Sequence, residues 1–124
     1  MWTPNRYVPN TTRIGPPSRW WPGNAYVNWV GIDAYYSSAS ETFGTLLDET
    51  LSAVKKLTSD PVIIAETGVW PGAGQAASIG ALFNGAEAAG ISGIIYFDLP
   101  GRQPWQLVSS SALVALSNAA RSFG

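Results

Sequence analysis

A chain of 124 residues, 46 % of them hydrophobic, is long enough for one compact domain with its own core. Its seven basic and eight acidic side chains leave a net charge of −1, which excludes the basic surface typical of nucleic-acid-binding proteins. The absence of cysteine and histidine excludes disulfides, thiolate nucleophiles, Ser-His catalysis and histidine metal sites. No apolar run has the length of a membrane span, and the first ten residues lack the pattern of a signal peptide.

The first third of the chain predicts a short strand end, an irregular loop and then a strand. "MWTPN" (1–5) is the strand end, and the stretch that follows it to residue 24 is rich in proline and asparagine. "YVNWVGIDAYY" (26–36) is apolar nearly throughout, as expected of a parallel strand that is covered on both faces. Trp29 lies inside this strand and is predicted to belong to the core.

An apolar stripe at helical spacing predicts a helix over 40–58. Ser40 can cap its start, and Lys55 and Lys56 lie in its last turn, where cations suit the helix dipole. The stripe consists of Phe43, Leu46, Leu47, Leu51, Val54 and Leu57.

Two further strand–helix pairs follow. The strands are "PVIIAE" (61–66) and "ISGIIYFD" (91–98), and the helices cover 74–90, which ends at Gly90, and 109–123. The residues expected to face inward are Ile79, Leu82, Phe83 and Ala86 in the first helix, and Leu113, Leu116 and Ala120 in the second.

The strand–helix unit repeats at an interval of 32 and then 31 residues, measured between Ile32, Ile64 and Ile95. Strands that alternate with helices are parallel, and each crosses over to the next through its helix. Eight such units would need about 250 residues, the usual size of a (β/α)₈ TIM barrel. The chain therefore predicts an α/β fold, a partial barrel of about half that size. An open doubly wound sheet is the competing fold, but its phosphate-binding glycine pattern is missing.

Three of the eight acids fall at or just past the carboxyl ends of predicted strands: Asp33, Glu66 and Asp98. Active-site groups of parallel barrels come from this end. Asp33 could instead satisfy loop amides, and Asp98 could cap the turn that follows it. Glu66 ends an apolar strand and has no neighbouring cation in the sequence, which favours a catalytic role.

The tryptophans are the second functional signal, because flat aromatic rings stack against sugar rings. Six tryptophans are unusual in so small a chain. The platform candidates lie in loops beside proline or glycine: Trp20, Trp21, Trp70 and Trp105.

Three stretches together resemble a known enzyme family: "WWPGNAYVNWVGIDAYY", "PVIIAETGVWPGAGQAASI" and "IIYFDLPGRQPWQLVSS". They are similar to the C-terminal half of glycoside hydrolase family 26, the β-mannanase family of clan A, and the middle stretch to its bacterial, actinobacterial-type members. The resemblance covers residues 1–124 as one domain. It implies barrel strands five to eight, with "MWTPN" at the end of the fifth.

The resemblance also implies roles for single residues. Glu66 matches the catalytic nucleophile on the seventh strand, and Tyr35 matches the tyrosine that hydrogen-bonds to it. Tyr96 matches the aromatic residue, usually tryptophan, that floors the sugar ring, and Asp33 supports the site. The remaining substrate-binding candidates are Trp2, Trp70, Asp98 and Trp105. No metal or cofactor is implied.

The implied activity is retaining hydrolysis of a β-linked polysaccharide, with mannan ahead of β-glucan and xylan, by a secreted parent protein. The general acid/base glutamate is expected on the fourth strand, before residue 1, so the chain alone is expected to turn over little. Its partner would be an upstream half-barrel or a second copy that completes the barrel. The alternative is a non-catalytic carbohydrate-binding or structural half-barrel remnant.

Overall fold

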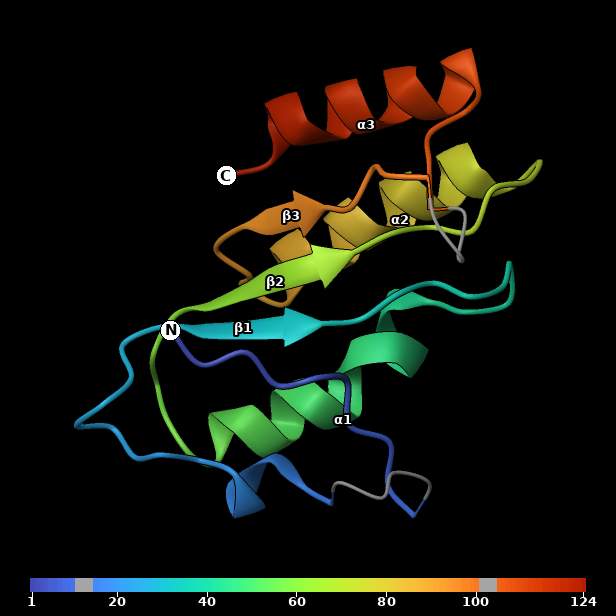
Figure 1. Cartoon of the computed structure of the whole chain (residues 1–124). Coiled ribbons are helices and arrows are strands. Elements are labelled where there is room, and N and C mark those ends of the chain that lie inside the picture. Colours follow the sequence, from blue (N-terminus) through green and yellow to red (C-terminus); the bar gives the residue numbers. More distant parts are fainter. Residues whose placement is uncertain (11–14, 101–104) are drawn as a thin grey trace.

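In the computed structural model (Figure 1), the described residues are 1–10, 15–100 and 105–124. Strands and helices alternate along the chain after a single 3₁₀ turn near the start. In order they are η1 (Pro17–Arg19), β1 (Val30–Asp33), α1 (Phe43–Lys55), β2 (Val62–Thr67), α2 (Gln75–Ala88), β3 (Ile94–Tyr96) and α3 (Ser110–Ser122). None of the helices in these ranges is long and apolar enough to cross a membrane.

The strands form an open parallel sheet in the order β1-β2-β3, as the sequence predicts. The register joins Ile32 to Ile64 and Ile64 to Ile94. The third isoleucine in the row is therefore Ile94 rather than Ile95. Because side chains alternate between the two faces of a strand, this shift of one residue turns Ile95 to the opposite face, where it is 55 % exposed.

The N-terminal segment extends the sheet beyond β1. Isolated parallel bridges pair Trp2 with Val30 and Asn5 with Asp33, and backbone hydrogen bonds between the two segments are 2.9 to 3.2 Å long. "MWTPN" thus lies where the predicted strand end should lie. Four parallel segments follow one another across the sheet in their order along the chain (Figure 1).

The core lies between one face of the sheet and the helices. Val30, Ile32 and Ile64 are fully buried there. α1 and α2 contact each other on this face, where Phe43 of α1 fits against Gly85 of α2 so closely that a Cβ at Gly85 would come within 2.3 Å of its ring. The helical residues of the core include Leu46, Leu47, Leu51, Val54, Ile79, Leu82, Phe83 and Ala86, as predicted.

Two helix ends can be compared with their predicted signals. Thr42, not Ser40, is the N-cap of α1, because Thr42 and Thr45 exchange side-chain and backbone hydrogen bonds in a capping box. Ser40 instead hydrogen-bonds to Ser38. Gly90 ends α2 as predicted, with a φ of +73° that glycine adopts without strain.

The predicted inner face of α3 is only partly right. Leu116 packs against the core, but Leu113 is 50 % exposed and Ala120 is exposed. α3 packs on α2 rather than on the sheet (Figure 1), so its inner face is set by one neighbouring helix. That face consists of Ala112, Ala115, Leu116, Ala119 and Phe123.

The prediction that Trp29 belongs to the core is wrong, since its side chain is 41 % exposed. β1 begins only at Val30, and Val30 faces the helices. The preceding residue is therefore turned toward the uncovered face of the sheet.

Candidate functional site

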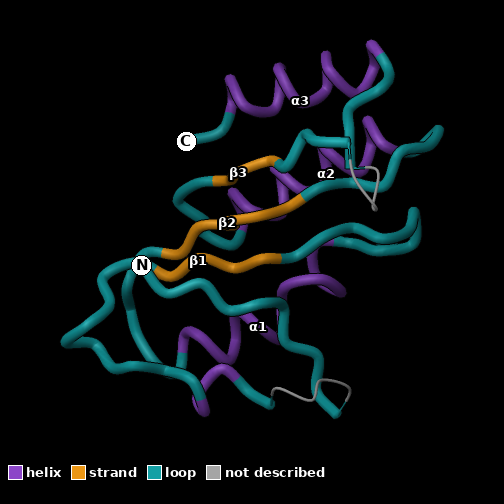
Figure 2. Tube along the Cα trace, viewed as in Figure 1, coloured by secondary structure: helices purple, strands orange, loops and turns teal. Residues whose placement is uncertain are grey.

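The loops that follow β1, β2 and β3 all leave the sheet at the same end (Figure 2). At this carboxyl edge the register places Asp33 beside Glu66, and the N-terminal bridge places Asn5 beside Asp33. Three polar side chains from three adjacent segments therefore form a row across the edge. Asp33 and Glu66 are predicted from the sequence, whereas Asn5 is not, because its position depends on a pairing between distant segments.

Glu66 and Tyr35 are joined by a hydrogen bond. The hydroxyl of Tyr35 donates to Oε2 of Glu66 at 2.7 Å, as expected for the pair. Glu66 is exposed, and no cation among residues 1–10, 15–100 and 105–124 pairs with it. Burial of the Tyr35 ring, its hydrogen bond to Glu66 and the charges of Glu66 and Asp33 all raise the pKa of Tyr35. Tyr35 is therefore a permanent donor toward the carboxylate at neutral pH.

Asp33 is a half-buried acid, and no hydrogen bond of its side chain to a loop amide is found among the described residues. Its Oδ1 is buried and has no hydrogen-bond partner among the described residues. Burial raises the pKa of Asp33, and the negative charge of Glu66 raises it further. The two adjacent acids at this edge thus interact electrostatically.

An aromatic wall stands beside the Tyr35–Glu66 pair. Trp105 stacks on Tyr35, with ring centroids 4.8 Å apart and planes 29° from parallel, and Phe97 meets Tyr35 edge-on at 6.2 Å. Trp70 meets Trp105 edge-on at 5.8 Å. Trp105 lies so close to Gly68 that a Cβ there would come within 2.8 Å of it.

The members of the wall differ in exposure. Trp105 is only 9 % exposed, so it supports Tyr35 from behind, while Trp70 and Phe97 are 42 % and 37 % exposed. Of the predicted platform residues in this region, Trp70 is therefore open to a ligand and Trp105 is a buried support.

Tyr96 does not join this wall. It pairs in register with Thr67, which is fully buried beneath the helices, and its ring packs against the core. Its hydroxyl accepts a hydrogen bond from the backbone N–H of Val69 at 3.1 Å. Phe97, the next residue, lies on the side of Tyr35 instead. Sequence analysis missed Phe97, although the alternation of side chains along a strand would have found it once Tyr96 was placed in the core.

Asp98 and Trp2 interact with partners other than Glu66 in the described part of the chain. Oδ1 of Asp98 accepts the N–H of Leu107 at 2.8 Å, so this acid closes the loop after β3, as its structural interpretation proposed. Trp2 pairs with Val30 at the opposite end of β1 and meets Trp21 edge-on at 5.1 Å. Residues 101–104, part of the third resembling stretch, lie outside the described residues.

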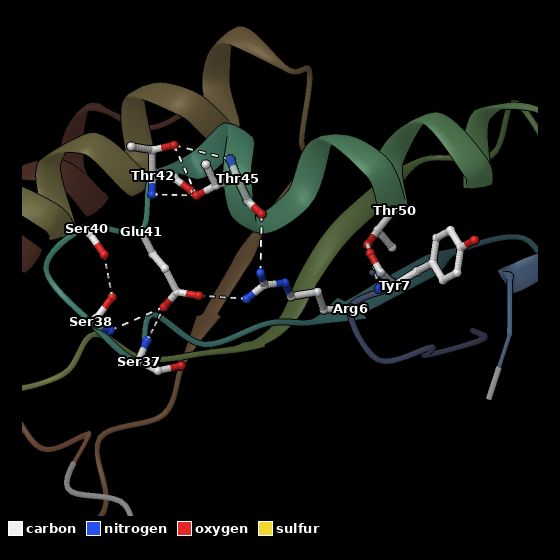
Figure 3. Close-up of polar contacts among 9 residues, drawn as sticks. All are labelled: Arg6, Tyr7, Ser37, Ser38, Ser40, Glu41, Thr42, Thr45 and Thr50. Atoms are coloured by element: carbon white, nitrogen blue, oxygen red, sulfur yellow. Dashed lines mark hydrogen bonds and ion pairs between the residues drawn. The ribbon is translucent and has the colours of Figure 1, made fainter. Parts of the chain in front are cut away.

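A second polar cluster holds the loop after β1 (Figure 3). Glu41 accepts hydrogen bonds from the backbone N–H groups of Ser37 and Ser38, and its Oε1 pairs with Nη1 of Arg6 at 2.8 Å. Nη2 of Arg6 donates to the carbonyl oxygen of Thr45 at 3.4 Å. The cluster ties the N-terminal segment to the loop and to α1.

The arrangement offers a carboxylate that faces water, a hydroxyl that donates to it and exposed aromatic rings beside it. Such a group can attack an electrophilic carbon of a flat ligand held against the rings. Within the described ranges, no three Asp or Glu side chains come together to hold a metal ion. No protein-family model matches the chain, and no curated protein matches it significantly, so sequence comparison assigns it no family.

Proposed function

We propose that this chain is the nucleophile-bearing half of a retaining glycoside hydrolase similar to the β-mannanases of glycoside hydrolase family 26. The observation that carries the proposal is the hydrogen bond from Tyr35 to the exposed carboxylate of Glu66 at the carboxyl edge of a parallel sheet. Glu66 is the proposed nucleophile, which attacks the anomeric carbon and forms a glycosyl-enzyme intermediate. Tyr35 orients it.

The surroundings of Glu66 support a catalytic rather than a structural role. A glutamate that served the fold would be expected to pair with backbone amides or a cation, as Glu41 does. Among the described residues Glu66 hydrogen-bonds to Tyr35 alone, and Tyr35 in turn contacts Phe97, whose exposed ring suits the apolar face of a sugar. We assign Asp33 a supporting role in the site, because it lies beside Glu66 on the adjacent strand.

The topology supports a half-barrel. Four parallel segments in chain order, with α1 and α2 on one face, are what strands five to eight of a (β/α)₈ barrel would provide. Retaining glycosidases need a second carboxyl group about 5–5.5 Å from the nucleophile. An upstream half-barrel, or a second copy, would complete the barrel, and in the first case its fourth strand would bring the acid/base glutamate. The parent protein would act outside the cell, where its polysaccharide is found.

A non-catalytic carbohydrate-binding half-barrel is the second candidate. It is favoured by one observation: the exposed aromatic surface of Trp70 and Phe97 is complete within this chain, whereas the carboxylate partner of a retaining pair is not identified in it. The two candidates differ in whether the completed barrel hydrolyses polysaccharide.

The test is a hydrolysis panel of mannan, β-glucan and xylan. We expect the 124-residue chain alone to be nearly inactive, because general acid–base assistance is worth about 10²–10⁴-fold. An extended chain whose preceding half completes eight strands should hydrolyse mannan. In that protein Glu66→Gln should lower kcat by roughly 10³-fold or more. Glu87→Gln, an exposed acid on α2, is the matched control and should leave kcat unchanged.

Two results would contradict the proposal. Near-parental hydrolysis by the Glu66→Gln variant would show that Glu66 is not the nucleophile. Absence of hydrolysis of all three polymers by a folded, completed barrel would leave only the non-catalytic candidate.

A further inference from the structure

A concavity lies between the loop after β1 and the loop after β2. It has a volume of about 230 Å³ and is lined by Ser38 and Ala39 from the first loop and by Trp70 and Pro71 from the second. Ser78 of α2 lines it as well. Glu66, Tyr35 and Phe97 do not line it, so it is separate from the carboxylate site.

The walls of this pocket are apolar or polar but uncharged. Trp70 and Pro71 provide rigid apolar surfaces, and Ser38 and Ser78 contribute neutral hydroxyl-bearing side chains to the lining, that of Ser38 being also hydrogen-bonded to Ser40. None of the lining residues in the described part of the chain is charged. A flat ring with one apolar face and several neutral hydroxyls matches this lining, whereas an anion or a cation would find no partner there.

Trp70 is held rigidly at the pocket. Its backbone N–H donates to the carbonyl oxygen of Tyr36 at 3.0 Å, and its ring stands nearly perpendicular to Trp105, at 87°. Only an edge-on contact is made with Trp105, so a face of the indole remains open, consistent with its 42 % exposure. Trp105 in turn stacks on Tyr35, the partner of Glu66. One aromatic residue therefore separates the pocket from the Tyr35–Glu66 pair.

We propose that the pocket is a sugar-binding subsite that holds one neutral pyranose unit of the β-linked polysaccharide, outside the cleavage position. Trp70 stacks on the apolar face of the ring, and Ser38 and Ser78 bind its hydroxyls. This inference rests on the proposed function, since it assigns the ring to the same polymer that Glu66 attacks. The pocket would hold one sugar unit of the polysaccharide while a neighbouring unit of the same polymer lies at Glu66.

The test is an NMR titration of the isotope-labelled 124-residue chain with mannotriose, cellotriose and xylotriose, followed at the backbone amides. At least one trisaccharide should shift the amides of Ser38, Gly72 and Ser78. Trp70→Ala should weaken that binding about tenfold, because it removes the stacked apolar surface. Trp29→Ala is the matched control, since Trp29 is 41 % exposed but lies outside the pocket, and its affinity should stay within about twofold of the parent.

A second variant protects the test against a folding defect in Trp70→Ala. Gly72 lines the pocket, and nothing lies within 4 Å of a Cβ placed there, so Gly72→Leu adds a bulky side chain at the pocket without a clash and without removing a contact. This variant should keep the parental amide spectrum elsewhere and lose the sugar-induced shifts. Parental affinity in both variants, or no shift at the pocket amides with any of the three sugars, would overturn the proposal.

Failure of the subsite is distinguishable from failure of the proposed function. If the completed barrel hydrolyses polysaccharide in a reaction that depends on Glu66, but no sugar shifts the pocket amides, only the subsite proposal is refuted. Shifts that Trp70→Ala abolishes, in a completed barrel without hydrolysis, would refute the catalytic function and keep the subsite.

Discussion

The loop after β1 and the carboxyl end of β2 each carry a glutamate, and their surroundings differ. Glu41 receives two backbone N–H groups and pairs with Arg6, and its side chain is 18 % exposed. Glu66 is exposed and, within the part of the chain that the structure describes, accepts a hydrogen bond from the hydroxyl of Tyr35 alone. Burial raises the pKa of Glu41, but the hydrogen bonds and charge of Arg6 and the amides of Ser37 and Ser38 outweigh it, so the pKa lies below its ordinary value.

The comparison separates a carboxylate that serves the fold from one that is available for a ligand. A partly buried carboxylate is tolerated when hydrogen bonds offset its desolvation, and Glu41 meets that condition. Glu66 is exposed to water, and its second carboxylate oxygen has no hydrogen-bond partner within the described ranges, so the carboxylate contributes little to the stability of the fold.

The two glutamates should differ in their effect on folding stability. Glu41→Gln removes the charge that Arg6 and two amides bind, and it should lower the free energy of unfolding by about 1–3 kcal/mol. Glu66→Gln should stay within about 1 kcal/mol of the parent, the range of surface substitutions. Urea unfolding of both variants measures the difference. A loss at Glu66 as large as the loss at Glu41 would mean that Glu66 ends its strand for a structural reason.

The tyrosines next to the two glutamates provide a crossed test. The pKa of Tyr35 is raised by burial and by Glu66, while burial and the charge of Glu41 raise the pKa of Tyr36 to about 12. Glu66→Gln should lower the pKa of Tyr35 toward its ordinary value of 10.0 and leave Tyr36 unchanged, and Glu41→Gln should do the reverse. Ring-carbon NMR titration resolves the two. Equal shifts of both tyrosines in either variant would contradict the separate environments.

The pH dependence of stability should show opposite contributions from Glu41 and Asp33. The pKa of Glu41 is lowered, so its contribution is present above its ordinary value of 4.5 and is lost as the pH falls through the lowered pKa. The pKa of Asp33 is raised by burial and by Glu66, so its ionisation costs stability as the pH rises above 3.8 and through the raised pKa.

Unfolding measurements between about pH 3 and pH 7 test both signs. Glu41→Gln should flatten the loss of stability in acid, and Asp33→Asn should make the protein slightly more stable at neutral pH. A less stable Asp33→Asn variant at neutral pH would show that the carboxylate of Asp33 has a stabilising partner in the fold.

Much of the fold follows from local patterns in the sequence. The helical stripe of α1 and the inner face of α2 are each repeated over several residues, so a single error does not change them, and the stop at Gly90 depends on the φ of one glycine that follows the helix. The face of α3 could not be predicted equally well, because apolar residues lie on both of its sides and its packing on α2 selects one of them. The N-cap of α1 is Thr42 rather than the predicted Ser40, because several neighbouring residues carry a hydroxyl that could cap the helix.

The residues of the candidate site likewise divide into those that local sequence signals predict and those that depend on strand register. Glu66 and Tyr35 could be predicted because a polar residue at the end of an apolar strand is a local signal, and parallel strands bring such ends to one edge. The face of Tyr96 depends on a register between β2 and β3 that differs by one residue from the spacing of the isoleucines. Phe97, rather than Tyr96, therefore stands beside Tyr35.

The sequence by itself determined the parallel α/β architecture and the acid at the end of β2, because periodicity and strand length are properties of neighbouring residues. Only the tertiary structure decided that Asn5 joins Asp33 and Glu66, that Trp105 supports Tyr35 from behind, and that Arg6 binds Glu41. Each of these contacts joins residues that lie far apart in the chain. Such contacts depend on the register of strands and the paths of loops, which are set by packing across the whole domain.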